Sequence, residues 1–537
     1  MTAGDAGTEP RHGRRWVLVV LMGLIGVVVA LPVVHLGREL AHPHPVEYAY
    51  DEDAYYTFSI AREIGTGHGI TVDGHTATSG TQALWTLLAA VPFALHLGTT
   101  GALAAIGVLC LATWLAAAAA FSAILAGFVP PGPVRRSEAR LLFAFVFLSA
   151  QLIRGFAWGG LETGLYLAAL LGTAWAFVFG ERAAHRSDAL FAAAAVVLVL
   201  TRVEAVVLLA VLAVARARLH RAGAGVRATV TPMLAGGAAL LVQAAWDWHV
   251  AHDLLPQSGI AESTRVYSLG RAVTNRAAVE TLPLDVVWPF LPTHRSEHRS
   301  LVIGAVFLVF ALALLRGSAL RIGRPRGLVL AALTGAGVLI GIAYVAVSSA
   351  FLFYDRYFVS LAVIVLGVTA LAVWRIGGLA IAAAERVGAG AWTPAAALAI
   401  PVLATAAVLA HERWTVAPQH MGPESVALGA HSDLAACGRI GMWESGRVGF
   451  AYPDRVVNLD GKVNPAALRA HLRGHTLLTY LDAEHIEVIY MEPHSEYFMD
   501  LVTPGWRRTW HVVPDGSTAV AELVVRDGTS CYEPRSS

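Results

Sequence analysis

Long apolar runs recur along this chain, and short polar segments separate them. An α-helix needs roughly 20 consecutive apolar residues to cross a bilayer. Hydrophobic residues make up 56% of the chain and charged residues only 14%, whereas a soluble domain carries about 25% charged residues. The sequence therefore predicts a mainly α, polytopic α-helical membrane protein. The runs lie near 16–36, 81–97, 102–129, 141–157, 161–180, 229–248, 301–316, 328–349, 357–374 and 392–410.

Three arginines, Arg11, Arg14 and Arg15, precede the first apolar run. A cleaved signal peptide would have a shorter apolar core, of about 7–15 residues, followed by a small-x-small cleavage site. We therefore expect an uncleaved first helix with its N-terminus in the cytoplasm. The formal net charge of +1 gives no basic field for binding nucleic acid.

An acidic cluster, Asp51, Glu52 and Asp53, stands in a polar segment of about residues 38–80, which we expect to be the first outer loop. A carboxylate there can act as a general base toward a hydroxyl group. A second carboxylate can hold the acceptor or a divalent cation, for which Asp51 and Asp53 are the candidates. The alternative is a solvated helix N-terminus, where acidic side chains suit the helix dipole.

Two apolar runs, 189–200 and 205–215, are each too short to span a bilayer alone and meet at Thr201-Arg202-Val203-Glu204. They form either one span with a buried Arg/Glu pair or two short helices that meet at an outer cavity. Arginines flank both outer ends of the pair. Because arginines favour the cytoplasmic side, the second arrangement is preferred.

The early runs conflict with the distribution of arginines. If every early run spans the membrane, Arg135, Arg136 and Arg140 lie outside, against the positive-inside rule. We therefore expect one early run to be re-entrant or interfacial, and the sequence does not say which.

Arginines near the ends of apolar runs are candidates for binding a lipid phosphate, since the guanidinium group matches phosphate oxygens. These candidates are Arg62, Arg202 and Arg356. Arg202 can instead be paired with Glu204, and Arg356 with Asp355. No Walker loop and no glycine-rich dinucleotide fingerprint is present, so a nucleotide cofactor has no visible binding loop.

Glu162 stands at the edge of a long apolar run. A carboxylate at the membrane edge is a candidate functional residue, and the alternative is an ordinary acid in the first turn of a helix.

The segment from about 411 to 537 is polar and differs from the rest of the chain. It alternates short β-like runs with helix-like pieces, which predicts a small α/β domain after a membrane domain at 1–410. Cys437 and Cys531 both lie in it and can pair if it faces an oxidising compartment. The expected strands are near 447–450, 456–459 and 486–490, and the expected helices are near 465–472 and 476–484.

Several short segments follow one another in a fixed order over about residues 50–470. They are Asp53-Ala54-Tyr55-Tyr56, Ala61-Arg62, Gly67-His68-Gly69, Thr78–Leu88, Gly160-Leu161-Glu162-Thr163-Gly164, Thr201-Arg202-Val203-Glu204, Leu254-Leu255-Pro256-Gln257-Ser258, Arg356-Tyr357 and Asn458–Pro465. Their order resembles that of the polytopic GT-C glycosyltransferases, and within them the mycobacterial terminal arabinofuranosyltransferases and their relatives. The resemblance implies about 11–13 transmembrane helices.

The resemblance implies an inverting enzyme with a polyprenyl-phosphate sugar as donor. It makes no cofactor certain, and the need for a divalent cation at Asp51 and Asp53 stays open. The acidic pair of the family falls on Glu52 and Asp53, with Asp51 as an extra acid, so the identity of the base stays open. The family proline is Val203 here, and the family lysine after the Leu-Pro segment falls near Glu262. The implied donor-phosphate residues are Arg62, Arg202 and Arg356, with Arg265 as a substitute for that lysine, and those of the acceptor or second acidic site are Glu162, Tyr55 and His68.

The resemblance also implies a multi-pass protein of the bacterial plasma membrane, with its active site and C-terminal domain outside the cytoplasm. The acceptor would be a glycan, lipid or protein of the cell envelope. A transporter or lipid-linked-sugar flippase is the main alternative. Transporters bury charged groups at the midplane between repeats, whereas here the acids cluster at the ends of the runs and no repeat is evident. A non-enzymatic assembly factor is a third hypothesis.

Overall fold

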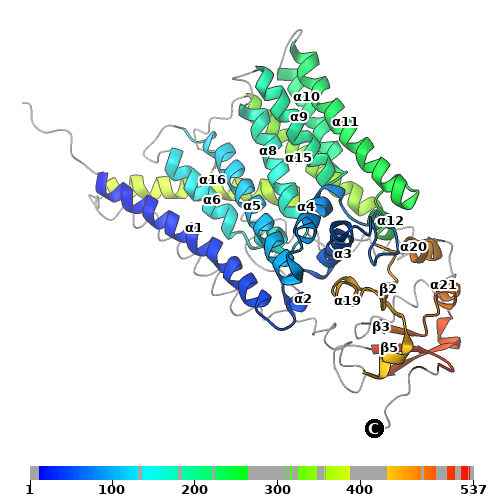
Figure 1. Ribbon diagram of the computed structural model, residues 1–537. Helices are drawn as coiled ribbons and strands as arrows, with labels where there is room; N and C mark the ends of the chain where they lie inside the picture. The colour runs from blue at the N-terminus through cyan, green and yellow to red at the C-terminus, as the bar shows by residue number, and fades with distance from the viewer. Residues whose placement is uncertain are drawn as a thin grey trace, which may run out of the picture.

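The fold has a helical part and a C-terminal part built on a β-sheet (Figure 1). Expected features that fall outside the described residues are Arg265, Asp355, the run near 392–410 and most of the run near 301–316. So does the expected boundary between the two domains. The computed structural model describes residues 11–130, 136–179, 184–219, 224–263, 309, 315–316, 324–347, 356, 359–386, 432–472, 477–491, 505–514, 522–529 and 531.

The helical part confirms the prediction of a polytopic α-helical membrane protein. Within the described residues, four helices are long and apolar enough to cross a membrane: Leu18–Leu40, Gly98–Ala126, Gly327–Tyr344 and Val359–Ala380. The helices are α1 (Arg11–Leu40), α2 (Pro45–Tyr48), α3 (Glu52–Thr66), α4 (Ala83–Ala94), α5 (Gly98–Ala126), α6 (Arg136–Ser149), α7 (Gln151–Trp158), α8 (Thr163–Phe179), α9 (Ala184–Thr201), α10 (Ala205–Leu219), α11 (Ala224–Ala251), α12 (Gln257–Ala261), α15 (Arg324–Val347) and α16 (Val359–Arg386).

Helix α4 is one candidate for the early run that does not span the membrane. It has 12 residues and is therefore about 18 Å long, too short for a hydrocarbon core of about 30 Å. It packs beside α3. If α4 does not cross the membrane, the start of α6 at Arg136 falls on the same side as the N-terminus, as the positive-inside rule requires.

Helices α9 and α10 are separate, as the two short apolar runs predicted. The segment Arg202-Val203-Glu204 joins them and lines a cavity. Irregular backbone at such a position is tolerated because it lines a cavity, where its polar groups find partners.

The C-terminal part is a small α/β domain, as predicted. Its five-stranded sheet has the order β2-β1-β3-β5-β4. Strand β1 pairs in parallel with β2 and β3, whereas β5 pairs antiparallel with β3 and β4. The elements are η4 (Ser432–Cys437), β1 (Ile440–Met442), α19 (Gly446–Ala451), β2 (Val456–Asn458), α20 (Pro465–Leu472), α21 (Leu477–Ala483), β3 (Val488–Met491), η5 (Trp506–Arg508), β4 (Trp510–Pro514) and β5 (Glu522–Arg526).

One expected strand is wrong. Residues 447–450 belong to helix α19 and not to a strand. The backbone N–H of Arg447 donates a 3.0 Å hydrogen bond to Oε1 of Glu52, a residue of α3. This distant acid satisfies an N–H group at the helix N-terminus that has no partner within the helix. The expected disulfide between Cys437 and Cys531 is present.

Candidate functional site

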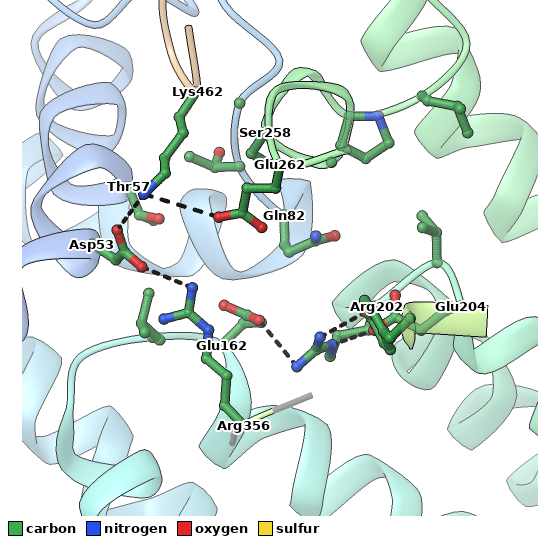
Figure 2. Close-up of a pocket in the computed structure, with 18 of the residues that line it drawn as sticks. Asp53, Thr57, Gln82, Glu162, Arg202, Glu204, Ser258, Glu262, Arg356 and Lys462 are labelled. Carbon is green, nitrogen blue, oxygen red and sulfur yellow. Dashed lines mark hydrogen bonds and ion pairs between the residues drawn. The ribbon is translucent and has the colours of Figure 1, made fainter. Parts of the chain in front are cut away.

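A cavity of about 400 Å³ lies where the helical part meets the C-terminal domain (Figure 2). Its wall is mainly apolar, and charged side chains gather on the remaining surface. The residues that line it are Asp53, Tyr56, Thr57, Gly80, Thr81, Gln82, Leu161, Glu162, Arg202, Val203, Glu204, Val207, Leu255, Pro256, Ser258, Gly259, Glu262, Ile340, Ala343, Tyr344, Arg356 and Lys462.

Helix α3 brings Asp53 to this cavity. The helix is anchored because Tyr55 and Phe58 pack with Phe93 of α4 and Phe450 of α19 in one buried cluster. Asp53 lies in the first turn of α3 and reaches the cavity from there. This packing fixes the direction of the carboxylate relative to the other helices.

Asp53 forms two ion pairs. Its Oδ2 accepts a 2.8 Å hydrogen bond from Arg356, and its Oδ1 lies 3.2 Å from Nζ of Lys462, as Figure 2 shows. The Asp53 side chain is only 10% exposed. Burial opposes its ionisation, but the charges of Lys462 and Arg356 outweigh burial and lower the pKa of Asp53 below its usual range. Without another ligand, Asp53 is therefore an ionised carboxylate with little affinity for a proton.

The other two acids of the cluster do not line the cavity. Glu52 points to α19, where it accepts the N–H of Arg447 and lies 3.7 Å from the Arg447 guanidinium. Burial raises the pKa of Glu52 to about 8, although Arg447 opposes this shift. The Asp51 carboxylate lies against Gly159. Of the three candidate bases, the structure brings Asp53 alone to the cavity.

A second charged group of the cavity is centred on Arg202. Its Nε lies 2.5 Å from Oε1 of Glu204, and its Nη1 lies 3.7 Å from Glu162. Tyr344 accepts a hydrogen bond from Arg202 at 3.0 Å and donates one to Glu204 at 2.6 Å. Two of the sequence candidates, Arg202 and Glu162, therefore meet here.

The turn before α8 positions Glu162. Gly160 has a φ of +84°, and a Cβ atom there would lie 2.8 Å from carbon atoms of Tyr50 and Phe58. Glycine alone fits such a backbone conformation without strain. The carbonyl oxygen of Gly160 accepts a 2.9 Å hydrogen bond from the indole N–H of Trp85.

Three other sequence candidates do not line the cavity. Arg62 donates a 2.8 Å hydrogen bond to the carbonyl oxygen of Phe450, and its guanidinium lies over the Phe450 ring. Tyr55 is fully buried among aromatic side chains. The exposed His68 lies 2.8 Å from Glu63. The structure therefore places all three outside the cavity lining.

The sequence did not assign Lys462, which is the largest omission. It comes from the C-terminal domain, and its Nζ lies 3.2 Å from Asp53, 3.8 Å from Glu444 and 3.9 Å from Glu262. One signal could have found it: Lys462 is the sole lysine of the chain and lies within a segment that resembles the family.

The donor set around Asp53 does not fit a divalent cation. Both carboxylate oxygens already face the cationic side chains of Arg356 and Lys462, whereas a metal ion requires converging oxygen ligands. Among the residues that the structure describes, no group of three or more His, Cys, Asp or Glu side chains is arranged to hold a metal ion.

Comparison with known proteins identifies the fold. No family model and no curated protein matches the sequence. One similar structure is that of ArnT from Cupriavidus metallidurans bound to undecaprenyl phosphate, with 12% identity, a TM-score of 0.51 and coverage of 96% of this chain and 99% of that chain. Another is the archaeal oligosaccharyltransferase AglB from Archaeoglobus fulgidus in complex with an inhibitory peptide and a dolichol-phosphate, with 13% identity, a TM-score of 0.51 and coverage of 98% and 76%. The chain thus has the fold of the GT-C membrane glycosyltransferases.

Proposed function

We propose that this chain is a membrane glycosyltransferase that moves a sugar from a polyprenyl-phosphate donor to a hydroxyl acceptor. One observation carries this proposal: a single cavity joins a buried carboxylate, Asp53, and the cations Arg356, Lys462 and Arg202 to a largely apolar wall. A lipid-linked sugar phosphate has three parts that match this cavity: an anion for the cations, a polar sugar for the site of the carboxylate and a hydrocarbon chain for the apolar wall.

The apolar wall suits the first prenyl units of such a donor. Leu161, Val207, Leu255 and Ile340 line it, and apolar area removed from water contributes about 25 cal/mol per Å² to binding. The cationic side chains are placed to hold the phosphate through charge-assisted hydrogen bonds. A lipid donor stays in the bilayer, which fits a cavity between membrane helices and a C-terminal domain.

Asp53 is the base in this proposal. The acceptor oxygen attacks the anomeric carbon while the bond from that carbon to the phosphate oxygen breaks. The electron pair of the broken bond stays on the phosphate, and the acceptor proton passes to Asp53. Attack opposite the leaving phosphate inverts the anomeric centre and yields a glycoside and polyprenyl phosphate.

The site is assigned to the outer face of a bacterial plasma membrane. The Cys437–Cys531 disulfide supports an oxidising compartment for the C-terminal domain. The arginines at the start of α1 and Arg136 at the start of α6 favour the cytoplasmic side for the opposite end of the bundle. The acceptor is then a glycan, lipid or protein of the envelope, and the sequence resemblance to terminal arabinofuranosyltransferases makes a pentofuranosyl donor the first to test.

The test is a transfer assay with purified protein in proteoliposomes. A panel of radiolabelled polyprenyl-phosphate sugars is supplied together with envelope membranes as acceptor. The expected result is label in the acceptor fraction and release of unglycosylated polyprenyl phosphate. Label that crosses the bilayer on an intact sugar phosphate, with no transfer from any donor, would instead indicate a flippase and overturn the proposal.

A further inference from the structure

The backbone around Lys462 forms a tight turn that directs its side chain into the cavity. The side chain of Asn458 accepts the N–H of Gly461 at 3.1 Å, and that of Asp460 accepts the N–H of Lys462 at 2.6 Å. Gly461 has a φ of +81°, which glycine adopts without strain. The turn is therefore defined locally within the C-terminal domain.

The helical part holds this turn from the other side. Gln257 donates a 2.7 Å hydrogen bond to the carbonyl oxygen of Gly461 and accepts one of 3.1 Å from Thr78. Gly80 lies so close to the carbonyl oxygen of Lys462 that a Cβ atom would overlap it. Contacts from α12 and from the loop before α4 thus fix the point at which the lysine enters the cavity.

The charges around the cavity are not those of a simple anion site. Three cations and four carboxylates line it, so an incoming phosphate must compete with carboxylates for the cations. The cations are Arg202, Arg356 and Lys462, and the carboxylates are Asp53, Glu162, Glu204 and Glu262.

We propose that Lys462 is a positioning residue shared by Asp53 and the donor phosphate: the phosphate of the bound donor takes up Lys462 together with Arg356, and Asp53 is thereby released to accept the proton of the acceptor. This inference rests on the proposed function. It makes the base competent only when donor is bound, and it makes the C-terminal domain part of the donor site.

Electrostatics supports this exchange. A phosphodiester carries one negative charge, and a like charge within about 4–6 Å of a carboxylate raises its pKa. Lys462 suits the exchange because an ammonium group on a flexible stem can turn between neighbouring anions. The charged groups around Asp53 are Arg356 beyond α15, Lys462 and Glu444 of the C-terminal domain, Glu262 after α12, and Asp51 and Glu52 at the start of α3.

The first experiment measures binding of undecaprenyl phosphate, which has no sugar, to detergent-solubilised full-length protein. Lys462→Gln should weaken binding about 10- to 100-fold, as expected for one charge-assisted hydrogen bond, and Lys462→Arg should retain most of it. Arg526→Gln is the matched control, because Arg526 is a half-exposed cation of the same domain paired with Asp482 outside the cavity.

The pH profile separates positioning from a merely structural role. The acid limb of the pH profile of kcat/KM reports the pKa of the base in the free enzyme, and the acid limb of kcat reports its pKa in the donor complex. In the wild type, the limb of kcat should lie at higher pH than that of kcat/KM for the donor. In Lys462→Gln the acid limb of kcat/KM should move to higher pH, so that it lies closer to the acid limb of kcat. A lysine that only supports the fold would leave both limbs in place.

A charge exchange gives a further check. Oε1 of Glu262 lies 3.9 Å from Nζ of Lys462, so a lysine at position 262 can place its ammonium near the same point. Lys462→Glu alone should lose lipid-phosphate binding, and adding Glu262→Lys should restore part of it. A folded double variant that binds no better than Lys462→Glu would contradict the inference.

The outcomes distinguish the two proposals. If the wild type transfers sugar but Lys462→Gln binds undecaprenyl phosphate as tightly as the wild type, the role of Lys462 is wrong and the proposed function stands. If the wild type binds no lipid phosphate and transfers no sugar, both are overturned.

Discussion

Replacing Asp53 by asparagine tests the proposed base most directly. Asparagine keeps the shape of the side chain but cannot accept the proton. Loss of a general base lowers kcat by about 10²–10⁴-fold, equivalent to roughly 3–5 kcal/mol of transition-state stabilisation. Asp53 is the acid that faces both Arg356 and Lys462 at 2.8 and 3.2 Å, so the same change also removes a competitor for these cations.

The variant should therefore show two opposite effects. Sugar transfer should fall by the factor given above, whereas binding of undecaprenyl phosphate should be as tight as in the wild type or tighter. Radiolabel transfer in proteoliposomes measures the first, and equilibrium lipid binding in detergent measures the second. Retained lipid binding also shows that the variant is folded, although two buried cations have lost their carboxylate.

Glu52→Gln is the matched control. Glu52 is the neighbouring acid, lies outside the cavity lining and contacts Arg447. A glutamine amide oxygen can accept the same Arg447 N–H, so transfer should stay close to the wild-type rate. An Asp53→Asn variant with full activity, or a Glu52→Gln variant that loses transfer while remaining folded, would refute the assignment of the base.

Three further predictions concern stability and positioning. Burial raises the pKa of Glu52 to about 8, above about 4.3 in the unfolded chain; the folded state thus keeps a proton that the unfolded state releases, and stability falls by up to about 1.4 kcal/mol per pH unit between these values. In denaturant unfolding, the free energy of unfolding of Glu52→Gln should therefore fall less between about pH 5 and pH 8 than that of the wild type. An identical slope of this free energy against pH in both proteins would contradict the prediction. Gly80→Ala should displace the Lys462 turn and raise KM for the donor with the lysine still present, and Gly155→Ala, where a Cβ atom has open space, should not; an unchanged KM in Gly80→Ala would show that the contact is not needed. Cys531→Ser should lower the unfolding free energy of the C-terminal domain by about 2–5 kcal/mol, measured by thermal melting with and without reductant, and equal melting of the variant and the oxidised wild type would contradict this.

Features that depend on neighbouring residues were predicted from the sequence. Apolar length and composition identified the membrane helices, because the bilayer imposes the same requirement on every span. The flanking arginines indicated that the runs at 189–200 and 205–215 are separate helices, and the structure places α9 and α10 there. The helices expected near 465–472 and 476–484 are also present as α20 and α21.

Features that depend on residues distant in the sequence were not predicted. Residues 447–450 have a strand-like composition but form a helix. In this helix the N–H of Arg447 donates to Glu52, which lies 395 residues earlier in the sequence. The 12-residue length of α4, which packs beside α3, was likewise not predicted from the apolar run at 81–97.

The acidic cluster shows both what neighbouring residues determine and what only distant residues determine. The sequence alone showed three neighbouring acids in a polar segment and offered a helix N-terminus as one interpretation, because polarity and helix-terminus preferences are local. It could not determine which acid is the base. Successive side chains of an α-helix point about 100° apart, and the residues that each of them faces come from distant parts of the chain. Only the tertiary structure turned Asp53 toward the cavity and brought Lys462, 409 residues away, to its carboxylate.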